Sequence, residues 1–452
     1  MNDNRIKTTL NLLCSTDYST YVSGHLAELA LFKDLNLNEA SSTENIFCIT
    51  DGRLSWPMVF SNKKNIHKVE EYFVVPSFAN PRWIIPVNSS GFGQMVKPSS
   101  MKAKAALLIF KYLYVLHLGW LIFPSRIRRY TFGNGNISTH LSNVCNELND
   151  CVSSGVIYLG SFGPLQKTTV EFSGVNGVAY YAKISDNNRA KDTLLAEEKA
   201  LKFVNGLFLS VAVIPKCKGL FSIDNTNLSF LIQTPLNAAN QCVCISNVLS
   251  KAITEIHNAT LKHDIGFYFS GMKILERNLT SNEISFFNGL QLKIFTKTKD
   301  VHTVLLKDDK CKKLYLSYSH GDFTRWNINV DKKHAYIFDW EEAGFRPVGY
   351  DVFHFELIEY VLVHHQDEPS IFYAKLVRLF SLDEKLLEGF FCNDELLMSF
   401  YLKLYLVQLV DVYLWHAFVH NSELYPVKDN IDKVLIFACE FLNYLEDHKN
   451  GR

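Results

Sequence analysis

The sequence lacks a charge imbalance, paired cysteines and an apolar N-terminus. Its 46 basic and 46 acidic side chains give a formal net charge of zero, so no nucleic acid is expected as a partner, because such binding requires basic surface. Ten cysteines are scattered without a CxxC pair, which predicts reduced thiols rather than zinc or disulfides. The first twenty residues hold no sustained apolar run, so we expect a cytoplasmic protein without a secretory signal.

Acidic residues are absent from one long stretch. None lies between Glu71 and Glu147, and an apolar run at 105–124 is interrupted only by Lys111 and His117. Eight basic residues occupy the stretch: Arg82, Lys97, Lys102, Lys104, Lys111, Arg126, Arg128 and Arg129. Three interpretations of segment 102–129 stay open: a core helix, a helix lying on an anionic membrane, and a spanning helix. A basic groove for an anionic saccharide would have the same composition.

The remaining patterns predict an α+β protein with three regions. Hydrophobic residues make up 48% of the chain and charged residues 20%, a globular composition. Residues 1–135 mix short apolar runs with turns and form an α/β region of unknown role. Alternating, strand-like segments with one helix fill 140–235, and residues 236–452 are mostly helical.

One strand-and-turn island interrupts the helical region. "SHGDFTRWN" ends in Asn327 and is followed by "AYIFDWEE", which delivers Asp339 at the end of a strand. A hairpin between these segments would bring Asn327 and Asp339 together, with Asp322 on the preceding loop. Two oxygen ligands suit Mg²⁺, and a free carboxylate accepts a proton from an attacking hydroxyl. This combination predicts phosphoryl transfer.

The island resembles the HGDxxxxN and DW motifs of the aminoglycoside phosphotransferase and choline kinase family. That family has a two-lobed, protein-kinase-like fold. The resemblance implies Asp322 as the catalytic base, His320 as a brace of the catalytic loop, and Asn327 and Asp339 as magnesium ligands. Arg325 departs from the proline that many relatives carry there.

The upstream region fits the small lobe of such a fold. The resemblance implies that Lys183, at the end of a strand, contacts the α and β phosphates of ATP and that Glu197, in a helix over 192–206, pairs with it; Glu198 is the competing partner. The turn "GSFG" would lie against the phosphates, and the strand at 228–236 would form the adenine-binding hinge. These cofactor-binding candidates are Gly160, Ser161, Gly163, Gln233 and Thr234.

The functional expectation is an ATP- and Mg²⁺-dependent phosphotransferase with an alcohol group as acceptor. A sugar or saccharide of cell-envelope polysaccharide metabolism is the favoured acceptor, because "PSFANPRWIIP" is similar to a stretch that precedes the kinase-like domain in some bacterial phosphotransferase-family proteins. Two alternatives stay open: a catalytically silent nucleotide-binding scaffold, and an amino-alcohol kinase of the choline type. Peripheral contact with the inner face of an anionic membrane through 102–129 is a further expectation.

Overall fold

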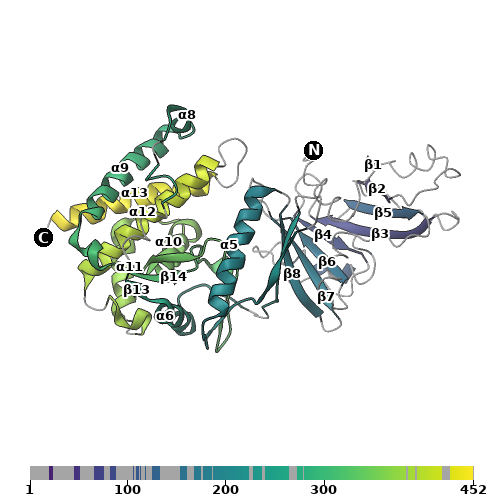
Figure 1. Ribbon diagram of the computed structural model, residues 1–452, viewed down its shortest axis with the longest axis horizontal. Helices are drawn as coiled ribbons and strands as arrows, with labels where there is room; N and C mark the ends of the chain where they lie inside the picture. The colour runs from purple at the N-terminus through teal and green to yellow at the C-terminus, as the bar shows by residue number, and fades with distance from the viewer. Residues whose placement is uncertain are drawn as a thin grey trace. The chain divides into compact units, whose positions relative to one another are not determined.

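The computed structural model separates the chain into two compact units (Figure 1). Unit 1 comprises residues 1–194 and 218–235, and unit 2 comprises 195–217 and 236–452. The structure describes residues 20–23, 45–50, 66–75, 82–87, 105, 108–110, 112–113, 118, 125–132, 153–159, 167–174, 177–185, 187–222, 228–236, 240–263, 272–277, 279–382, 385–391, 394–419 and 428–450.

Unit 1 is built on one large sheet with the strand order β1-β2-β5-β3-β4-β6-β7-β8-β11-β10. Its strands are β1 (Thr20–Ser23), β2 (Asn45–Thr50), β3 (Ile66–Val75), β4 (Trp83–Pro86), β5 (Arg126–Phe132), β6 (Ser153–Tyr158), β7 (Thr168–Gly174), β8 (Gly177–Ser185), β10 (Cys217–Ser222) and β11 (Ser229–Gln233). Alternate residues such as Val170 and Phe172 in β7, and Ala182 and Ile184 in β8, are buried in one core. This is the two-residue period of strands that bury one face.

The sheet continues across the boundary expected near residues 135–140. β4 pairs antiparallel with β6, with Trp83 opposite Tyr158. Strands from the N-terminal region and strands of the expected small lobe therefore belong to the same sheet, and Figure 1 shows them as one array.

Segment 102–129 is described only in part. Residues 108–110 are helical, and Phe110 is fully buried against Phe73, with ring centroids 5.7 Å apart. Arg126, expected among the exposed cations, is instead buried and pairs with Glu71 at 2.8 Å. Its charge is therefore satisfied inside unit 1.

Unit 2 is mostly helical, as the sequence predicts. Helix α5 (Asn188–Asn205) enters it from unit 1 and begins four residues before the predicted start at residue 192. The other elements are β9 (Ala212–Val213), β12 (Asn240–Gln241), α6 (Asn247–Thr260), β13 (Lys262–His263), α8 (Ser281–Ile284), α9 (Gly289–Leu306), η2 (Asp309–Lys313), β14 (Tyr315–Ser319), η3 (Arg325–Asn327), β15 (Ile328–Val330), β16 (Ala335–Ile337), β17 (Gly344–Pro347), α10 (Tyr350–Ile358), the π-helical turn η4 (Glu359–Val363), α11 (Pro369–Leu382), η5 (Leu386–Gly389), α12 (Glu395–Val419) and α13 (Lys428–Asn450).

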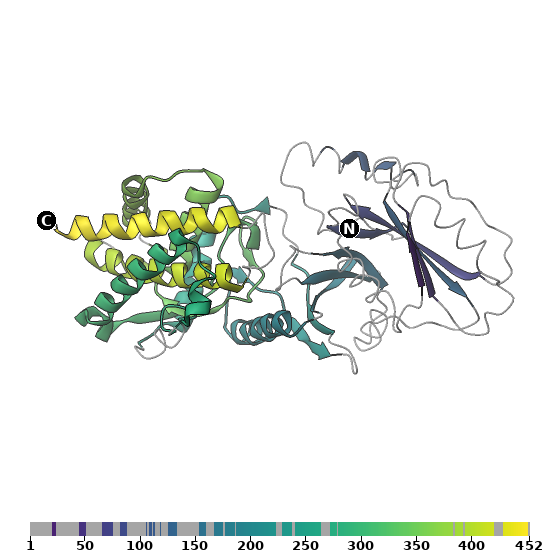
Figure 2. The same cartoon turned by 90° about the horizontal axis from the view of Figure 1, so that it is seen from above.

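Helix α12 forms the centre of unit 2 and packs against α9 and α13 (Figure 2). It is apolar on all sides, as a helix surrounded by others must be. In the described part of the chain it is the one helix long and apolar enough to cross a membrane, over Glu395–Phe418, yet 67% of that window is buried. Its aromatic side chains, including Tyr401 and Tyr405, fill the core.

Two small sheets hold the island that carries the sequence motif. β15 and β16 form the predicted hairpin, with Ile328 opposite Ile337. β14 lies between β13 and β17 in the second sheet. The sequence from β14 to α10 thus places a turn, a hairpin and a helix start within one compact part of unit 2.

Candidate functional site

The HGD turn directly follows β14 and depends on a glycine. Gly321 has a φ of +89°, and a Cβ at this position would lie 2.1 Å from the carbonyl oxygen of Glu342. A side chain would therefore be both strained and obstructed. The sequence keeps glycine where the backbone bends close to the turn at Glu342 that precedes β17.

A buried carboxylate at the start of α10 holds the same turn. Asp351 accepts the backbone N–H of His320 at 2.8 Å and that of Gly321 at 3.1 Å. Burial raises the pKa of Asp351, while the charge of His320 and these two hydrogen bonds oppose the rise. Asp351 thus connects the turn to α10.

His320 links the turn to the segment that follows β16. Its Nδ1 accepts the backbone N–H of Asp322 at 3.3 Å, and its Nε2 lies 2.9 Å from the carbonyl oxygen of Phe338. The ring is buried edge-on to Trp340, at 4.8 Å. His320 therefore holds the turn against the segment that follows β16.

Asp322 lies between an amide and an imidazole. Asn327 Nδ2 donates to Asp322 Oδ2 and to its backbone carbonyl, both at 2.9 Å, and His354 Nε2 lies 3.4 Å from Oδ1. Burial alone would raise the pKa of Asp322, but the hydrogen bond and charge of His354 and the charge of His320 outweigh it, so the pKa is lowered. The side chain is still 49% exposed. Asp322 is therefore an oriented, ionised and accessible carboxylate.

Asp339 lies next to two further carboxylates. It follows β16 with a φ of +71°, a conformation that aspartate and asparagine tolerate better than most residues. Ligand oxygens of Asp339, Glu197 and Glu341 lie within 4.8 Å of one another. The backbone N–H of Phe338 donates to Asn327 O at 3.1 Å, which joins this segment to the catalytic-loop candidate.

The arrangement refines the expected set of metal ligands. Asn327 was predicted as a ligand; because its Nδ2 is bound to Asp322, its Oδ1 is the atom left to face a cation. Glu197 is fully buried, whereas Glu198 pairs with Lys202 at 2.8 Å. Of the two glutamates considered in α5, Glu197 is the one whose carboxylate lies near Asp339, and Glu341 lies beside both.

The candidate nucleotide residues lie in unit 1. Lys183 is a half-buried residue of β8, opposite Thr169 of β7 and Leu231 of β11. Gln233 ends β11 and is buried, and Thr234 follows it. Gly160, Ser161 and Gly163 lie outside the described residues, so their predicted role is not examined by the structure.

Several residues around Asp322 were not predicted from the sequence. Glu342 pairs with Lys273 at 3.2 Å, and Arg346 lies over the Tyr350 ring at 4.5 Å. The pKa of Tyr413 in α12 is raised by burial and by the charge of Asp322. These residues come from segments far apart in sequence, and none carries a local motif that could have indicated it.

Arg325, which stands where many proteins with the similar motif carry proline, forms an ion pair. Its Nε lies 2.7 Å from Oε1 of Glu359, a buried residue at the start of the π-helical turn. Burial raises the pKa of Glu359, and Arg325 opposes that rise. The catalytic-loop candidate is therefore stiffened by the ion pair between Arg325 and Glu359 rather than by the ring of a proline.

Comparisons with known proteins place this site in a recognised segment. The model of the phosphotransferase enzyme family matches residues 291–368, which contain His320, Asp322, Asn327, Asp339 and Asp351. No curated protein matches the chain.

Solved structures give weaker likenesses. An amicoumacin kinase, solved with AMP-PNP, Ca²⁺ and its antibiotic, is 14% identical with a TM-score of 0.41, over 63% of this chain and 90% of the other. A thermostable mutant of aminoglycoside phosphotransferase APH(4)-Ia is 12% identical with a TM-score of 0.46, over 69% and 100%. A choline/ethanolamine kinase family protein from Mesorhizobium loti is 13% identical with a TM-score of 0.38, over 64% and 91%.

The family match falls on the stretch that the sequence motif had singled out. It confirms the predicted resemblance and the predicted enzyme class, a phosphotransferase that acts on hydroxyl groups. The sheets and helices of the structure confirm the α+β class. The chain is thus similar to the phosphotransferase enzyme family through the segment that holds its candidate catalytic residues.

Proposed function

We propose that this protein is a small-molecule kinase that uses Mg²⁺ and ATP to phosphorylate a hydroxyl group of a sugar or saccharide. The observation that carries the proposal is the geometry of Asp322. An ionised carboxylate, held by Asn327 on one side and His354 on the other and still half exposed, is suited to bind and orient an acceptor hydroxyl. As the oxygen attacks, the same carboxylate takes up its proton.

The donor atoms present fit Mg²⁺. The carboxylates of Asp339, Glu197 and Glu341 are hard oxygen ligands, and Mg²⁺ prefers such ligands together with phosphate oxygens and water. When bound, the ion neutralises charge on the phosphates of ATP. Asp339 and Asn327 Oδ1 are the proposed protein ligands, and Glu197 and Glu341 hold negative charge beside them.

The proposed nucleotide contacts use unit 1. Lys183 binds phosphate oxygens, and backbone groups at Gln233 and Thr234 bind the adenine. A lysine on a strand is a point charge that suits a phosphate group. The turn of Gly160, Ser161 and Gly163 would cover the phosphates through its backbone N–H groups.

A sugar acceptor is favoured by an exposed aromatic residue on the loop. Trp326, immediately before Asn327, is 51% exposed. Its flat apolar face, beside a carboxylate, suits the apolar face and hydroxyls of a sugar ring. An amino-alcohol pocket needs accessible aromatic rings, but Tyr401 and Tyr405 of α12 are buried in the core.

An acceptor screen tests this function. Purified protein with Mg²⁺ and ATP is assayed for acceptor-dependent ADP release against sugars, oligosaccharides, amino alcohols and aminoglycosides. We expect turnover with a sugar or saccharide and loss of that turnover in Asp322→Ala. Turnover with an amino alcohol alone would show that the acceptor is an amino alcohol and not a sugar. Binding of Mg²⁺-ATP without transfer to any acceptor would favour the catalytically silent nucleotide-binding scaffold.

Contact with an anionic membrane through 102–129 is also proposed. Leu108, Ile109 and Tyr112 are 57%, 55% and 68% exposed, which is apolar surface beside the basic residues of this segment. Since Arg126 is paired internally, the remaining cations of the segment are Lys102, Lys104, Lys111, Arg128 and Arg129. We expect flotation with anionic vesicles at low salt, release at high salt, and weaker flotation when Lys102, Lys104 and Lys111 are all replaced by Gln. If the protein does not float with anionic vesicles at low salt, the proposed membrane contact is wrong.

A further inference from the structure

Glu359 is a buried carboxylate at the start of the π-helical turn η4, which continues α10. It is 3% exposed, and within the described part of the chain neither of its carboxylate oxygens accepts a hydrogen bond. A buried charge without hydrogen bonds is costly unless an opposite charge lies beside it. π-Helical turns are rare and are found frequently at functional sites. Glu359 therefore depends on a cation close to it.

Arg325 supplies that cation from the catalytic-loop candidate. Its Nε lies 2.7 Å from Oε1 of Glu359, and the arginine side chain is only 20% exposed. His364 Nε2 lies 4.0 Å from the other carboxylate oxygen, but its side chain is 55% exposed, so solvent weakens this contact. Burial raises the pKa of Glu359, and the charge of Arg325 is the strongest influence that opposes the rise. The buried carboxylate is thus compensated mainly by the loop.

Arg325 is also held from the side of β12. Gln241 Nε2 donates to the carbonyl oxygen of Arg325 at 3.1 Å, and Arg325 Nη2 donates to the carbonyl oxygen of Val243 at 3.5 Å. The backbone N–H of Cys242 donates to Ile328 O at 3.1 Å, just beyond the loop. Arg325 therefore lies between two fixed elements, the π-helical turn and the segment that begins at β12.

A single turn connects Arg325 to the candidate catalytic base. Arg325 begins η3 and Asn327 ends it, and the backbone N–H of Asn327 closes the turn by donating to Thr324 O at 3.0 Å. Thr324, the N-cap, makes no side-chain capping hydrogen bond. The Asn327 side chain donates to Oδ2 and to the backbone carbonyl of Asp322, both at 2.9 Å. A displacement of Arg325 would therefore move the amide that orients Asp322.

The backbone at position 325 has the conformation that proline favours. Thr324 has a φ of −125° and a ψ of 162°, close to the extended region that a residue before proline adopts. Arg325 is the first residue of a 3₁₀ turn, where proline is favoured because its ring fixes φ at about −65°. Arginine does not restrict φ in this way. In this chain the contact between Arg325 and Glu359 restrains the turn instead.

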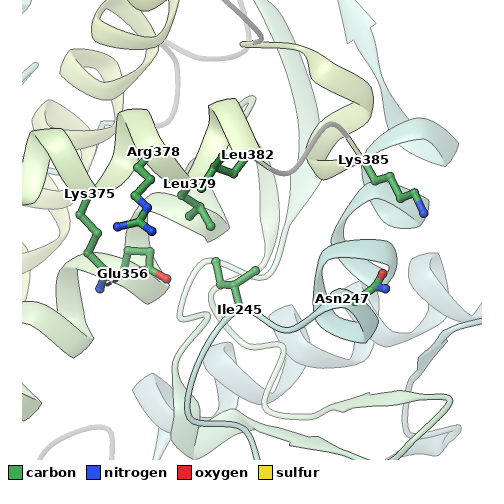
Figure 3. Close-up of a pocket in the computed structure, with 8 residues that line it drawn as sticks. All are labelled: Ile245, Asn247, Glu356, Lys375, Arg378, Leu379, Leu382 and Lys385. Atoms are coloured by element: carbon green, nitrogen blue, oxygen red, sulfur yellow. Dashed lines mark ion pairs between the residues drawn. The ribbon is translucent and has the colours of Figure 1, made fainter.

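A second buried ion pair lies next to the first and joins two helices. Lys375 Nζ of α11 lies 2.5 Å from Oε2 of Glu356 in α10, a carboxylate only 5% exposed. Figure 3 shows Lys375 reaching from α11 to Glu356. Glu356 and Glu359 are three residues apart and so lie on one face of the helix. Within the described residues, the Lys375–Glu356 pair makes no hydrogen bond or ion pair to the loop 320–327, so it is a matched control for the Arg325 contact.

We propose that Glu359 is a positioning residue for phosphate transfer, which through its ion pair with Arg325 fixes the turn η3 and thereby the orientation of Asp322. The inference rests on the proposed kinase function, because it concerns the rate of that reaction. A misplacement of about 1 Å at a reacting group can cost about 10²-fold in rate. Release of this turn should therefore lower kcat and leave the KM of the acceptor nearly unchanged.

Steady-state kinetics with Mg²⁺, ATP and the acceptor found in the screen test the proposal. We expect Arg325→Ala and Glu359→Gln each to lose about tenfold or more in kcat, with the acceptor KM within about threefold of wild type. Arg325→Ala/Glu359→Gln should lose no more than either single variant, because both changes remove the same contact. The control Lys375→Ala/Glu356→Gln should keep wild-type kcat, and denaturant unfolding shows that each variant is folded under the assay conditions.

Proline separates positioning from general stabilisation. In Arg325→Pro/Glu359→Gln the ion pair is absent, but the ring restrains the turn. We expect kcat to return to within about threefold of wild type, since proline at a compatible position restricts the chain without strain. Three results would overturn the inference and leave the proposed function standing: wild-type kcat in Glu359→Gln, a loss of kcat that proline does not repair, or additive losses in the Arg325→Ala/Glu359→Gln variant.

Amide hydrogen exchange examines the same turn without any acceptor. Peptides covering 320–330 should exchange faster in Glu359→Gln than in wild type, slowly again in Arg325→Pro/Glu359→Gln, and at the wild-type rate in the Lys375→Ala/Glu356→Gln control. A wild type that transfers phosphate to no acceptor would refute the proposed function and the role in transfer, while faster exchange in Glu359→Gln would still show that Glu359 holds the turn. Equal exchange in wild type and Glu359→Gln would overturn the inference whether or not the protein is a kinase.

Discussion

His354 Nε2 lies 3.4 Å from Oδ1 of Asp322, and on its other side His354 Nδ1 lies 3.4 Å from the hydroxyl of Tyr405. The contact joins α10 to the loop that carries the candidate catalytic base. It is also the first of the influences that lower the pKa of Asp322 against the opposing effect of burial. The ionisation of the base therefore depends on a histidine that lies 32 residues further along the chain.

Replacing His354 should shift the pH dependence of transfer. In His354→Phe the burial of Asp322 and the repulsion by Asp339 remain, so its pKa should rise. Because the base must be ionised, the acid limb of kcat should move to higher pH, whereas the wild-type enzyme keeps Asp322 ionised below the usual pKa of 3.8. The profile of kcat against pH is the measurement, with exposed His263→Phe as control. An acid limb at the same pH in wild type and His354→Phe would show that His354 does not set this pKa.

Gly321→Ala should destabilise the fold and abolish transfer. A left-handed conformation costs an L-residue about 1–2 kcal/mol, and the added Cβ meets Glu342 O at 2.1 Å. We expect a loss of at least about 2 kcal/mol in the free energy of unfolding of unit 2. Gly289→Ala is the matched control, since a Cβ there meets nothing within 4 Å at the start of α9.

Denaturant unfolding of the two glycine variants gives the comparison. Gly289→Ala should be neutral or stabilising, because alanine is favoured over glycine in helices. Equal stability of Gly321→Ala and wild type would mean that the turn relaxes without cost, contrary to the tight contact described here.

Asp339→Asn should weaken Mg²⁺-dependent ATP binding and leave the fold intact. Asparagine tolerates the φ of +71° as aspartate does, so the change removes charge without straining the backbone. Calorimetric titration of ATP with and without Mg²⁺ measures the effect, and thermal unfolding serves as the control for folding. If the Mg²⁺-dependent gain in affinity is the same as in wild type, Asp339 is not a metal ligand.

The local geometry of the site could be predicted from the sequence, and its long-range support could not. The HGD spacing and the alternating segment after it predicted a hairpin, and the structure pairs Ile328 with Ile337 and brings Asn327 to Asp322. Both relationships join residues close in sequence. Turn chemistry and strand period are local signals, and they fix such short-range geometry.

The contacts of Asp351, His354 and Arg126 escaped prediction because they depend on chain segments that meet only after folding. Asp351 binds a turn 30 residues before it, and Arg126 is neutralised by Glu71 across a strand pair. From the number of basic residues alone, Arg126 would be expected on the surface. The pairing of β3 with β5 instead places it next to Glu71, with which it forms a buried ion pair. Likewise, the sequence predicted a boundary between residues 135 and 140, but the pairing of β4 with β6 carries the sheet across it.

The most direct test of the account is phosphate transfer by Asp322→Ala beside Asp300→Ala, an exposed aspartate of α9. With the acceptor found in the screen, ADP release and ATP affinity are measured for both variants and wild type. The account predicts that Asp322→Ala keeps wild-type affinity for Mg²⁺-ATP and loses about 10²-fold or more in kcat, while Asp300→Ala is unchanged. Transfer by Asp322→Ala within threefold of wild type would contradict the assignment of Asp322 as the catalytic base.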